Sequence, residues 1–264
     1  MLGQCGGETL IDVERIQMQL RAAVRLSHDA VAVPPFTCFF NPDSDATYAN
    51  YAIPDASVGV GVEASLRAVA ELFRDRQRRP RFEYLEGFAP DLATVLEQQG
   101  YQCNMRSLLM VCTPDTLTPP PWPAGFTVEA LTPATPIDVV QDLMTIQARA
   151  FGDPDAPRTT VTEAQQFLTR FVAMQLFLAR LNGAPVSVAS LTAPHAGIAE
   201  LAGVATSAAF RRRGFAAALT YAVTQAAFAQ GIDQVFLTAV NVEAGHAYAR
   251  AGFTPCGSGL VYVL

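Results

Sequence analysis

Charged residues are scarce in this chain of 264 residues, at 16% against roughly a quarter in typical globular proteins. Half of the residues are hydrophobic, which excludes disorder over long stretches and suffices for one or two packed cores. The net charge is -6, so the chain lacks the positive charge that a general nucleic-acid binder needs for phosphate contacts. Any local cluster of basic residues therefore stands out.

Several other signals are missing. The five cysteines contain no C-x-x-C pair, and the three histidines lack the spacing of metal ligands, so we expect reduced thiols and no structural zinc site. No run of about 18 apolar residues occurs, and the N-terminus has no basic start followed by an apolar segment. We therefore expect neither a membrane span nor a signal peptide, and a cytoplasmic location.

Five prolines occur between residues 113 and 125. Proline is excluded from helix interiors and central strands, and this composition is typical of a semi-rigid extended linker. The stretch divides the chain into halves of similar length. We expect a first domain at 1–118, a proline-rich linker at 119–125 and a second domain at 126–264.

The two halves carry similar patterns. Gly100-Tyr101 and Gly252-Phe253 each close an expected helix, and they lie 152 residues apart. This offset indicates a diverged internal duplication, although two unrelated α+β domains remain an alternative. In the first half we expect helices at 64–77 and 89–99 and strands at 79–85 and 108–112. In the second half we expect helices at 137–151, 162–174, 215–230 and 243–250, and strands at 126–130, 176–181, 185–192, 198–205, 234–240 and 260–264.

The sheet of the second half is expected to be mixed. Asn182-Gly183 is a strong hairpin signal, and strands joined by turns are antiparallel neighbours. After Ala205 the pattern changes to a basic loop, a helix and a strand, which is a crossover unit. Such a unit makes the next strand pair parallel.

The basic loop is the most informative segment. An apolar strand runs into Arg211-Arg212-Arg213 and Gly214, followed by a helix that begins with small residues. The first turn of a helix has unpaired amides and the positive end of the helix dipole, and glycine allows a ligand close to the backbone. These features suit a pyrophosphate, whereas the alternative is a solvated basic turn. Neither the phosphate-loop nor the dinucleotide fingerprint is present.

The loop resembles the acyl-CoA signature of the GNAT superfamily of N-acetyltransferases, in the form Arg211-x-x-Gly214-x-Ala216. A second stretch, with Asn241, Tyr248 and the closing Gly252-Phe253, looks like the second motif of that superfamily. The resemblance implies an α+β fold of two tandem GNAT-like domains, each a mixed, mostly antiparallel twisted sheet flanked by helices. The first copy is degenerate. Gly61 matches the glycine of the loop, but no arginine stands before it in the motif. Glu63 occupies the position where a small residue is expected.

The resemblance also implies a reaction, the transfer of an acetyl or other acyl group from acetyl-CoA to a primary amine by direct attack. Tyr248 corresponds to the tyrosine that protonates the departing thiolate. A phenol suits this role, because its ordinary pKa near 10 keeps it protonated at neutral pH. The resemblance places the cofactor at Val204, Ala205, Thr206, Arg211, Arg212, Arg213, Gly214, Phe215, Ala216, Ala217 and Asn241.

A base must remove a proton from the attacking amine. Glu200, on the strand that leads to the basic loop, is the first candidate, and His195 is the second. The expected partner is a small-molecule amine or the amino group of a protein; Asp153, Asp155 and Glu163 hint at a cationic one. Nucleic acid and membrane are not expected, and a homodimer stays open. The rival functions are a non-catalytic acyl-CoA-binding or protein-interaction module, and a nucleotide-phosphate binder.

Overall fold

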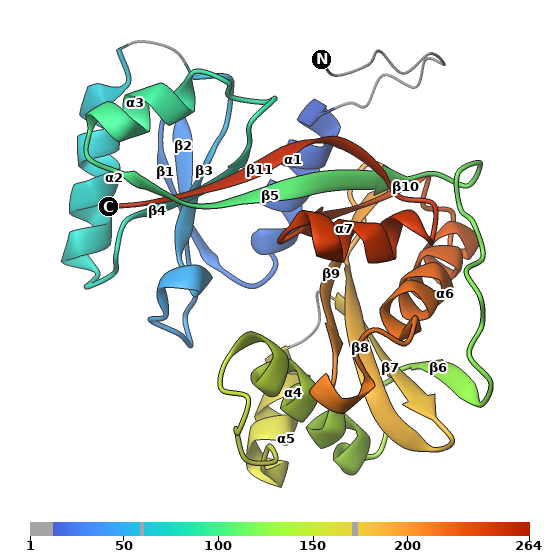
Figure 1. The fold of residues 1–264 in the computed structure, drawn as a ribbon. Coiled ribbons are helices and arrows are strands. Elements are labelled where there is room, and N and C mark those ends of the chain that lie inside the picture. Colours follow the sequence, from blue (N-terminus) through green and yellow to red (C-terminus); the bar gives the residue numbers. More distant parts are fainter. Residues whose placement is uncertain (1–12, 59–60, 171–173) are drawn as a thin grey trace.

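The structure, a computed structural model, describes residues 13–58, 61–170 and 174–264. Figure 1 shows strands that run through the middle of the molecule and helices on both sides of them. The strands are β1 (Asp29–Val33), β2 (Phe36–Phe40), β3 (Tyr51–Pro54), β4 (Arg81–Leu85), β5 (Gln102–Cys112), β6 (Phe126–Ala130), β7 (Met174–Leu181), β8 (Ala184–Thr192), β9 (Ile198–Thr206), β10 (Gln234–Ala239) and β11 (Thr254–Val263). The helices are α1 (Val13–Val24), α2 (Glu63–Asp75), α3 (Leu92–Gln98), α4 (Ile137–Phe151), α5 (Val161–Arg170), α6 (Phe215–Ala229) and α7 (Val242–Ala249), with short 3-10 turns at Thr47–Ala49 and Ala208–Phe210.

The described strands form one sheet of eleven, in the order β1-β2-β3-β4-β11-β5-β10-β9-β8-β7-β6. Within it β3 pairs with β4, and β10 with β9, in parallel, while the other neighbours are antiparallel. The expected mixed, mostly antiparallel sheet flanked by helices is confirmed. The sheet is continuous across both halves, a feature that the sequence did not indicate.

The last strands of the two halves are exchanged. β11, from the end of the chain, lies between β4 and β5, which both belong to the first half. β5 in turn lies between β11 and β10, which both belong to the second half. Each half therefore completes the sheet of the other, as the crossing of β5 and β11 in Figure 1 shows. The division at 119–125 stays a prediction.

The exchange follows an internal symmetry. Ser107 of β5 pairs with Gly259 of β11, and these two positions are 152 residues apart, the same offset as the two glycine-aromatic closures. The strand order reads as a palindrome about this pair, with β4 opposite β10 and β3 opposite β9. Helix α2 begins 152 residues before α6. This arrangement supports the duplication inferred from the sequence.

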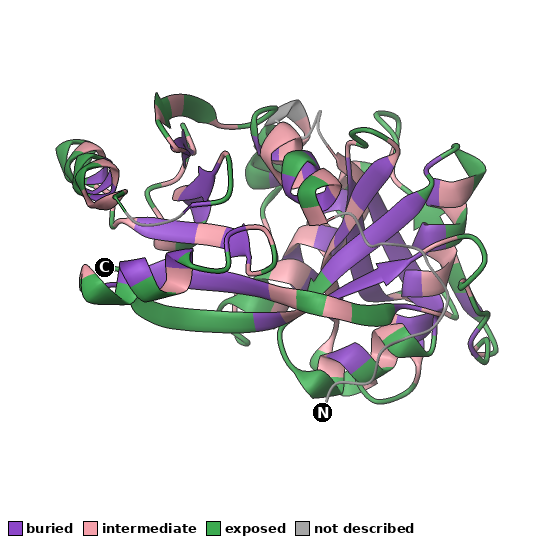
Figure 2. Ribbon diagram, turned by 90° about the horizontal axis from the view of Figure 1, so that it is seen from above, coloured by how far each residue is buried: buried purple, intermediate pink, exposed green. Residues whose placement is uncertain are grey.

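Helix α1 packs on the centre of the sheet and contacts both halves. Ile16 is fully buried among Leu85, Leu109, Ile198 and other apolar side chains of the central strands. Side chains alternate along a strand. Met110, the residue after Leu109 in β5, therefore points to the opposite face of the sheet and joins the core under α6. Figure 2 shows the buried central strands and the exposed outer sides of the helices.

Most expected elements of the second half are confirmed within a few residues. Residues 126–130 and 137–151 form a strand and a helix with those bounds, Asn182-Gly183 connects the antiparallel β7 and β8, and β9 pairs with β10 in parallel. Two boundaries were wrong. The strand expected at 260–264 begins at Thr254, six residues earlier. The helix expected to reach Met174 is described only to Arg170, and Met174 begins β7. The sequence patterns predicted neither α1 nor β1–β3.

The proline-rich segment contains no helix or strand between Cys112 and Phe126. It runs over the turn that follows α7, where the Thr118 amide donates to the Ala251 carbonyl at 3.2 Å. Gly252 has φ +94°, and a Cβ there would lie 2.0 Å from the Thr116 carbonyl oxygen. Only glycine fits this close approach. Among the helices of the described chain, none combines the length and apolar character that crossing a membrane requires.

Candidate functional site

The two parallel strands at the centre of the second half separate part of the way along. β9 and β10 pair at Ile198–Gln234, Ala199–Val235 and Glu200–Phe236, and no pair follows. Val204, Ala205 and Thr206 therefore lie on the part of β9 that has left β10. A gap between two parallel strands exposes backbone groups to a ligand.

A β-bulge lies on this separated part of β9. Between the pairs Val188–Ala205 and Ser190–Ala202, β9 has one residue more than β8. The extra residue of a bulge has no ladder partner, so its backbone groups are open to other bonds. The bulge contains Val204, one of the residues at which the resemblance places the cofactor.

The basic loop follows β9 and ends at α6. Gly214 is the N-cap of α6 and has φ +85°, a conformation that costs a residue with a Cβ roughly 1 kcal/mol or more. A Cβ on Gly214 would meet no atom within 4 Å, so the first turn of α6 opens onto free space. Phe215 and Ala217 are buried at the start of the helix. The ring of Phe215 stacks on Phe126 at 5.2 Å between centroids, which fixes the helix start against β6.

The arginines of the loop carry positive charge that no ion pair neutralises within the part of the chain described. The Nε of Arg211 donates to the Thr206 carbonyl at 3.1 Å, which leaves its outer nitrogens for other partners. The guanidinium of Arg213 lies over the rings of Phe210 and Phe215, at 5.6 and 5.2 Å from their centroids. The three side chains are exposed. The charge and the open helix start fit a pyrophosphate.

A cavity of about 400 Å³ opens at this point between the loop and α7. It brings together most residues of the predicted cofactor loop with four residues of α7 and its C-terminal end. Its lining consists of Thr206, Phe210, Arg211, Arg212, Gly214, Phe215, Ala216, Ala217, Glu243, His246, Ala247 and Arg250. Glu243 is the acidic member of this lining.

A groove of about 630 Å³ lies on the other side of Arg212. It shares Arg212, Gly214, Ala217 and Arg250 with the first cavity, and the proline-rich segment forms its far wall. Trp122 lines this groove and is half-exposed, and its Nε1 donates to the Phe126 carbonyl at 3.1 Å. The segment predicted as a mere linker is therefore part of the wall of the site.

Helix α7 places the two predicted residues of the second motif beside the 400 Å³ cavity, but neither is part of its lining. Asn241 is the N-cap of α7, and its Oδ1 accepts from the Ala244 amide at 2.8 Å. Tyr248 is half-buried, with its ring 6.5 Å from that of Phe253, and burial raises the pKa of the phenol. The phenol is therefore held in its neutral form, as a proton donor requires. The roles of Asn241 and Tyr248 stay predictions.

Glu200 lies at the point where β9 and β10 separate. Its carboxylate faces a cavity of about 160 Å³. Burial, with a smaller contribution from the nearby charge of Glu83, raises the pKa of Glu200 to about 7. A carboxylate with this pKa accepts a proton far more readily than an ordinary one. His195, the second candidate base, lies exposed in the turn between β8 and β9, where its backbone pairs with Ile198.

Glu83 was missed as a site residue. It lies in β4 between the buried residues Phe82 and Tyr84, and it lines the same cavity as Glu200. The sequence signal was weak, because Arg81, two residues earlier in the same strand, already provides an ion-pair partner for this carboxylate. Its proximity to Glu200 could not be predicted, since it depends on the exchanged strands.

A larger cavity of about 660 Å³ lies between the first half and helices α4 and α5. The first half contributes polar side chains to it, among them His28, Asn41 and Asp43, and the second half contributes Glu163 and apolar residues such as Met144. His28 has a lowered pKa because it is partly buried. Of the three acidic residues that hinted at a cationic acceptor, only Glu163 lines this cavity, and its Oε2 accepts from the amide and hydroxyl of Thr160 at the start of α5.

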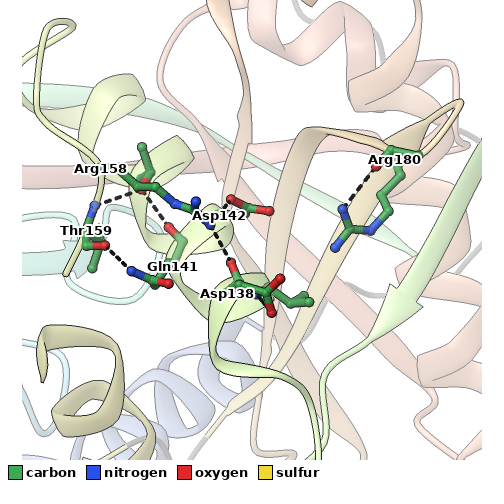
Figure 3. Close-up of polar contacts among 9 residues, drawn as sticks. Asp138, Gln141, Asp142, Arg158, Thr159 and Arg180 are labelled. Atoms are coloured by element: carbon green, nitrogen blue, oxygen red, sulfur yellow. Dashed lines mark hydrogen bonds and ion pairs between the residues drawn. The ribbon is translucent and has the colours of Figure 1, made fainter. Parts of the chain in front are cut away.

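The loop between α4 and α5 is fixed against α4 by the polar contacts that Figure 3 shows. Gln141 Nε2 donates to the Thr159 carbonyl at 2.7 Å, and Arg158 pairs with Asp142 at 2.9 Å. The hydroxyl of Thr145 accepts from the Thr159 amide at 3.0 Å. These bonds hold α5, and with it the wall of the 660 Å³ cavity, in place.

Comparison with known proteins agrees with this geometry. The model of the acetyltransferase (GNAT) family matches residues 140–253, which include the basic loop, α6 and α7. A search of curated proteins gave no match. Among solved structures, a GCN5-related N-acetyltransferase from Kribbella flavida is 25% identical, with a TM-score of 0.79, over 97% of this chain and 96% of that one.

Two further solved structures share the fold at lower identity. A GCN5-related N-acetyltransferase from Sphaerobacter thermophilus is 18% identical, with a TM-score of 0.63, over 87% of this chain and 80% of that one. A tandem GNAT protein from the clavulanic acid biosynthesis pathway is 16% identical, with a TM-score of 0.62, over 87% of this chain and 78% of that one. The structural match extends over both halves, and the family model covers residues 140–253 of the half that carries the loop. Residues 140–253 therefore form a domain of the acetyltransferase (GNAT) family, and the chain as a whole has the fold of a tandem GNAT protein.

Proposed function

We propose that the protein transfers the acetyl group of acetyl-CoA to a primary amine by direct attack. The observation that carries this proposal is the 400 Å³ cavity, in which the open first turn of α6 and arginines without an ion-pair partner among the described residues meet at the far end of the part of β9 that has left β10. The pyrophosphate of the cofactor fits the amides that follow Gly214 and the guanidinium groups of Arg211 and Arg212. The pantetheine arm fits the gap beside Val204 and Ala205.

The residues of the chain have separable roles in this reaction. Bound acetyl-CoA supplies the thioester carbonyl that the amine attacks. Glu200 takes the proton that the amine must lose, directly or through a water molecule. A backbone amide in the bulge near Val204 donates to the negative charge that develops on the carbonyl oxygen. Tyr248 donates a proton to the thiolate, and its buried phenol is neutral and able to do so.

The proposed acceptor is a small-molecule amine or the amino group of a protein, and we place the reaction in the cytoplasm. The four cysteines of the described residues are free thiols, which agrees with a reducing compartment. A protein acceptor is convenient to test, because this chain contains no lysine. Acetylation of a lysine-containing peptide is therefore not confused with acetylation of the enzyme's own lysines.

Two measurements test the proposal in sequence. Calorimetry compares the binding of acetyl-CoA with that of ATP, which separates an acyl-CoA site from a general phosphate site. Release of free thiol from acetyl-CoA is then followed with a panel of primary amines, in comparison with the release that occurs without an amine. Amine-dependent release supports the transferase. Tight binding of acetyl-CoA without any amine-dependent release would instead identify a non-catalytic binding module.

A further inference from the structure

The 160 Å³ cavity at Glu200 is built by both halves of the chain. The first half contributes Tyr51 from β3, Arg81 and Glu83 from β4, and Leu20 from α1, while β9 contributes Glu200. The exchanged strands β5 and β11 bring these elements to one face of the sheet. One water molecule occupies about 30 Å³ in the liquid, so the cavity has room for a small ionic group and a short stem.

The two carboxylates of this cavity have different surroundings. Glu83 Oε1 accepts two hydrogen bonds from Arg81, from Nε at 2.8 Å and from Nη2 at 2.6 Å. Within the described part of the chain, no side-chain hydrogen bond or ion pair reaches the carboxylate of Glu200. Its main-chain amide donates to the Thr192 hydroxyl at 2.8 Å, a bond that fixes the strand and does not involve the carboxylate.

The charges nearby do not compensate for Glu200. Arg21 of α1 pairs with Asp55 at 2.5 Å, and the Thr37 hydroxyl donates to that same carboxylate. Arg81 is the cationic side chain among the described residues that line the cavity, and it is bound to Glu83. Two carboxylates thus face one guanidinium. Burial raises the pKa of Tyr51 and the charges of both carboxylates raise it further, so its phenol stays neutral.

A carboxylate without a cationic partner in a partly buried cavity costs desolvation free energy unless a bound cation balances its charge. The remaining lining is mostly apolar, with Leu20, Ile53, Leu85, Met105 and Val261, and it suits methylene groups. The ligand that fits both features has a positive nitrogen with at least two N–H donors and an aliphatic stem. A metal ion fits less well, because no group of three or more potential ligands that could hold one occurs among the described residues.

We propose that this cavity binds the acceptor as a primary ammonium ion on an aliphatic stem, and that Glu83 of the first half holds the nitrogen beside Glu200. The proposal rests on the proposed transferase function and adds a substrate class to it. The ammonium ion donates one proton to the Glu200 carboxylate, which becomes a neutral carboxylic acid, and the neutral amine keeps its lone pair for the attack. The second proton, which the nitrogen loses as the amide forms, replaces the proton that Tyr248 gives to the departing thiolate, and Glu200 later releases its proton to solvent. The degenerate half thereby supplies part of the acceptor site.

The test uses the full chain, with n-butylamine as acceptor and n-butanol as an uncharged competitor of the same size. Glu83→Gln removes one negative charge and keeps the shape, and we expect the KM for n-butylamine to rise about tenfold, since a hydrogen bond to a charged group contributes about 1.5 kcal/mol or more. The pH midpoint of kcat/KM for the amine shifts downward, because a neighbouring negative charge no longer opposes the ionisation of Glu200. Butanol does not compete at comparable concentrations.

Arg81→Gln gives the opposite charge change at the same place. It frees the Glu83 carboxylate, so we expect the KM for n-butylamine to fall severalfold, whereas a merely structural role predicts that both variants lose activity. Glu86→Gln is the matched control. Glu86 follows the same strand, pairs with Arg106 and is not part of the cavity lining, and its variant should have the KM of the wild-type chain.

Calorimetry separates the failure of this proposal from the failure of the transferase. Each variant is titrated with acetyl-CoA, whose affinity should be unchanged. An amine KM and a pH midpoint that Glu83→Gln leaves unaltered, in an enzyme that binds acetyl-CoA and acetylates n-butylamine, would overturn the assignment of the cavity alone. Wild-type protein that binds acetyl-CoA but neither acetylates n-butylamine nor binds it in calorimetry would overturn it as well. Failure to bind acetyl-CoA would overturn the transferase itself.

Discussion

Replacing Gly214 by glutamate places a carboxylate where the cofactor's pyrophosphate is proposed to lie. Two effects contribute. A residue with a Cβ at φ +85° is strained by roughly 1 kcal/mol, and this strain lowers stability. The larger effect is electrostatic. Two unit charges about 4 Å apart repel by about 4 kcal/mol at an effective dielectric constant of 20, and the neighbouring arginines offset part of that repulsion.

We therefore expect Gly214→Glu to weaken acetyl-CoA binding by about 2 to 4 kcal/mol, or about 30- to 1000-fold in Kd. Calorimetry measures the affinity, and thermal unfolding measures the stability. Gly214→Gln is the matched control, because it has the same strain and nearly the same size without the charge. It should bind acetyl-CoA much more tightly than the glutamate variant, since a Cβ at this position meets no atom within 4 Å.

A second control isolates the backbone strain. Gly231 has φ +82°, lies just beyond the other end of α6 and also has free space around its Cβ position. Gly231→Gln should lower the unfolding temperature about as much as Gly214→Gln and leave the Kd of acetyl-CoA unchanged. Equal affinities of the glutamate and glutamine variants at position 214 would refute the reasoning, because the charge would then have no anion to repel.

Four further predictions concern other parts of the molecule. Tyr248→Phe should lower kcat by tenfold or more with little change in the Kd of acetyl-CoA, since it removes only the proton donor; an unchanged kcat would remove that role. The rate should rise as the pH increases through about 7, where Glu200 ionises. The free energy of unfolding should fall as the pH rises from the unfolded to the folded pKa of Glu200, because the folded state binds the extra proton in that range. A Glu200→Gln variant whose stability falls with rising pH as steeply as that of the wild-type chain would contradict this. Expressed alone, residues 119–264 should lack a stable fold and show no cooperative unfolding transition, because both neighbours of β11 belong to the first half. Co-expression with residues 1–118 should restore a folded complex. A cooperative transition of 119–264 by itself would oppose the prediction. Trp122, the single tryptophan of the chain, should change its fluorescence when CoA fills the groove beside it, and an unaltered spectrum at saturating CoA would exclude contact.

Much of the second half could be predicted because its signals are local. Asn182-Gly183 specifies a hairpin by its backbone preference, and the basic loop before a small-residue helix is recognisable within a few residues. The start of α6 at Phe215 follows from the positive φ that Gly214 alone among its neighbours adopts easily. These features depend on sequence positions that are close together.

The strand exchange could not be predicted, because its cause is not local. β5 and β11 both end in a buried apolar run, and each is preceded by a helix that ends in a glycine-aromatic pair. Either strand can pair with β4 or with β10 as far as local pattern is concerned. The nearness of Glu83 to Glu200 follows from that pairing, and so does the position of the proline-rich segment beside Arg212. Sequence patterns alone therefore indicated the loop that we propose for the cofactor, and they missed the cavity that both halves of the chain build.

The central claim is that the turn from Arg211 to Ala217 binds the pyrophosphate of acyl-CoA. A crystal structure of the full chain with CoA tests it most directly. We expect the two phosphorus atoms in the 400 Å³ cavity, within hydrogen-bond distance of the amides that follow Gly214 and of the Arg211 and Arg212 guanidinium groups. Bound CoA with its pyrophosphate anywhere else on the molecule would contradict the account.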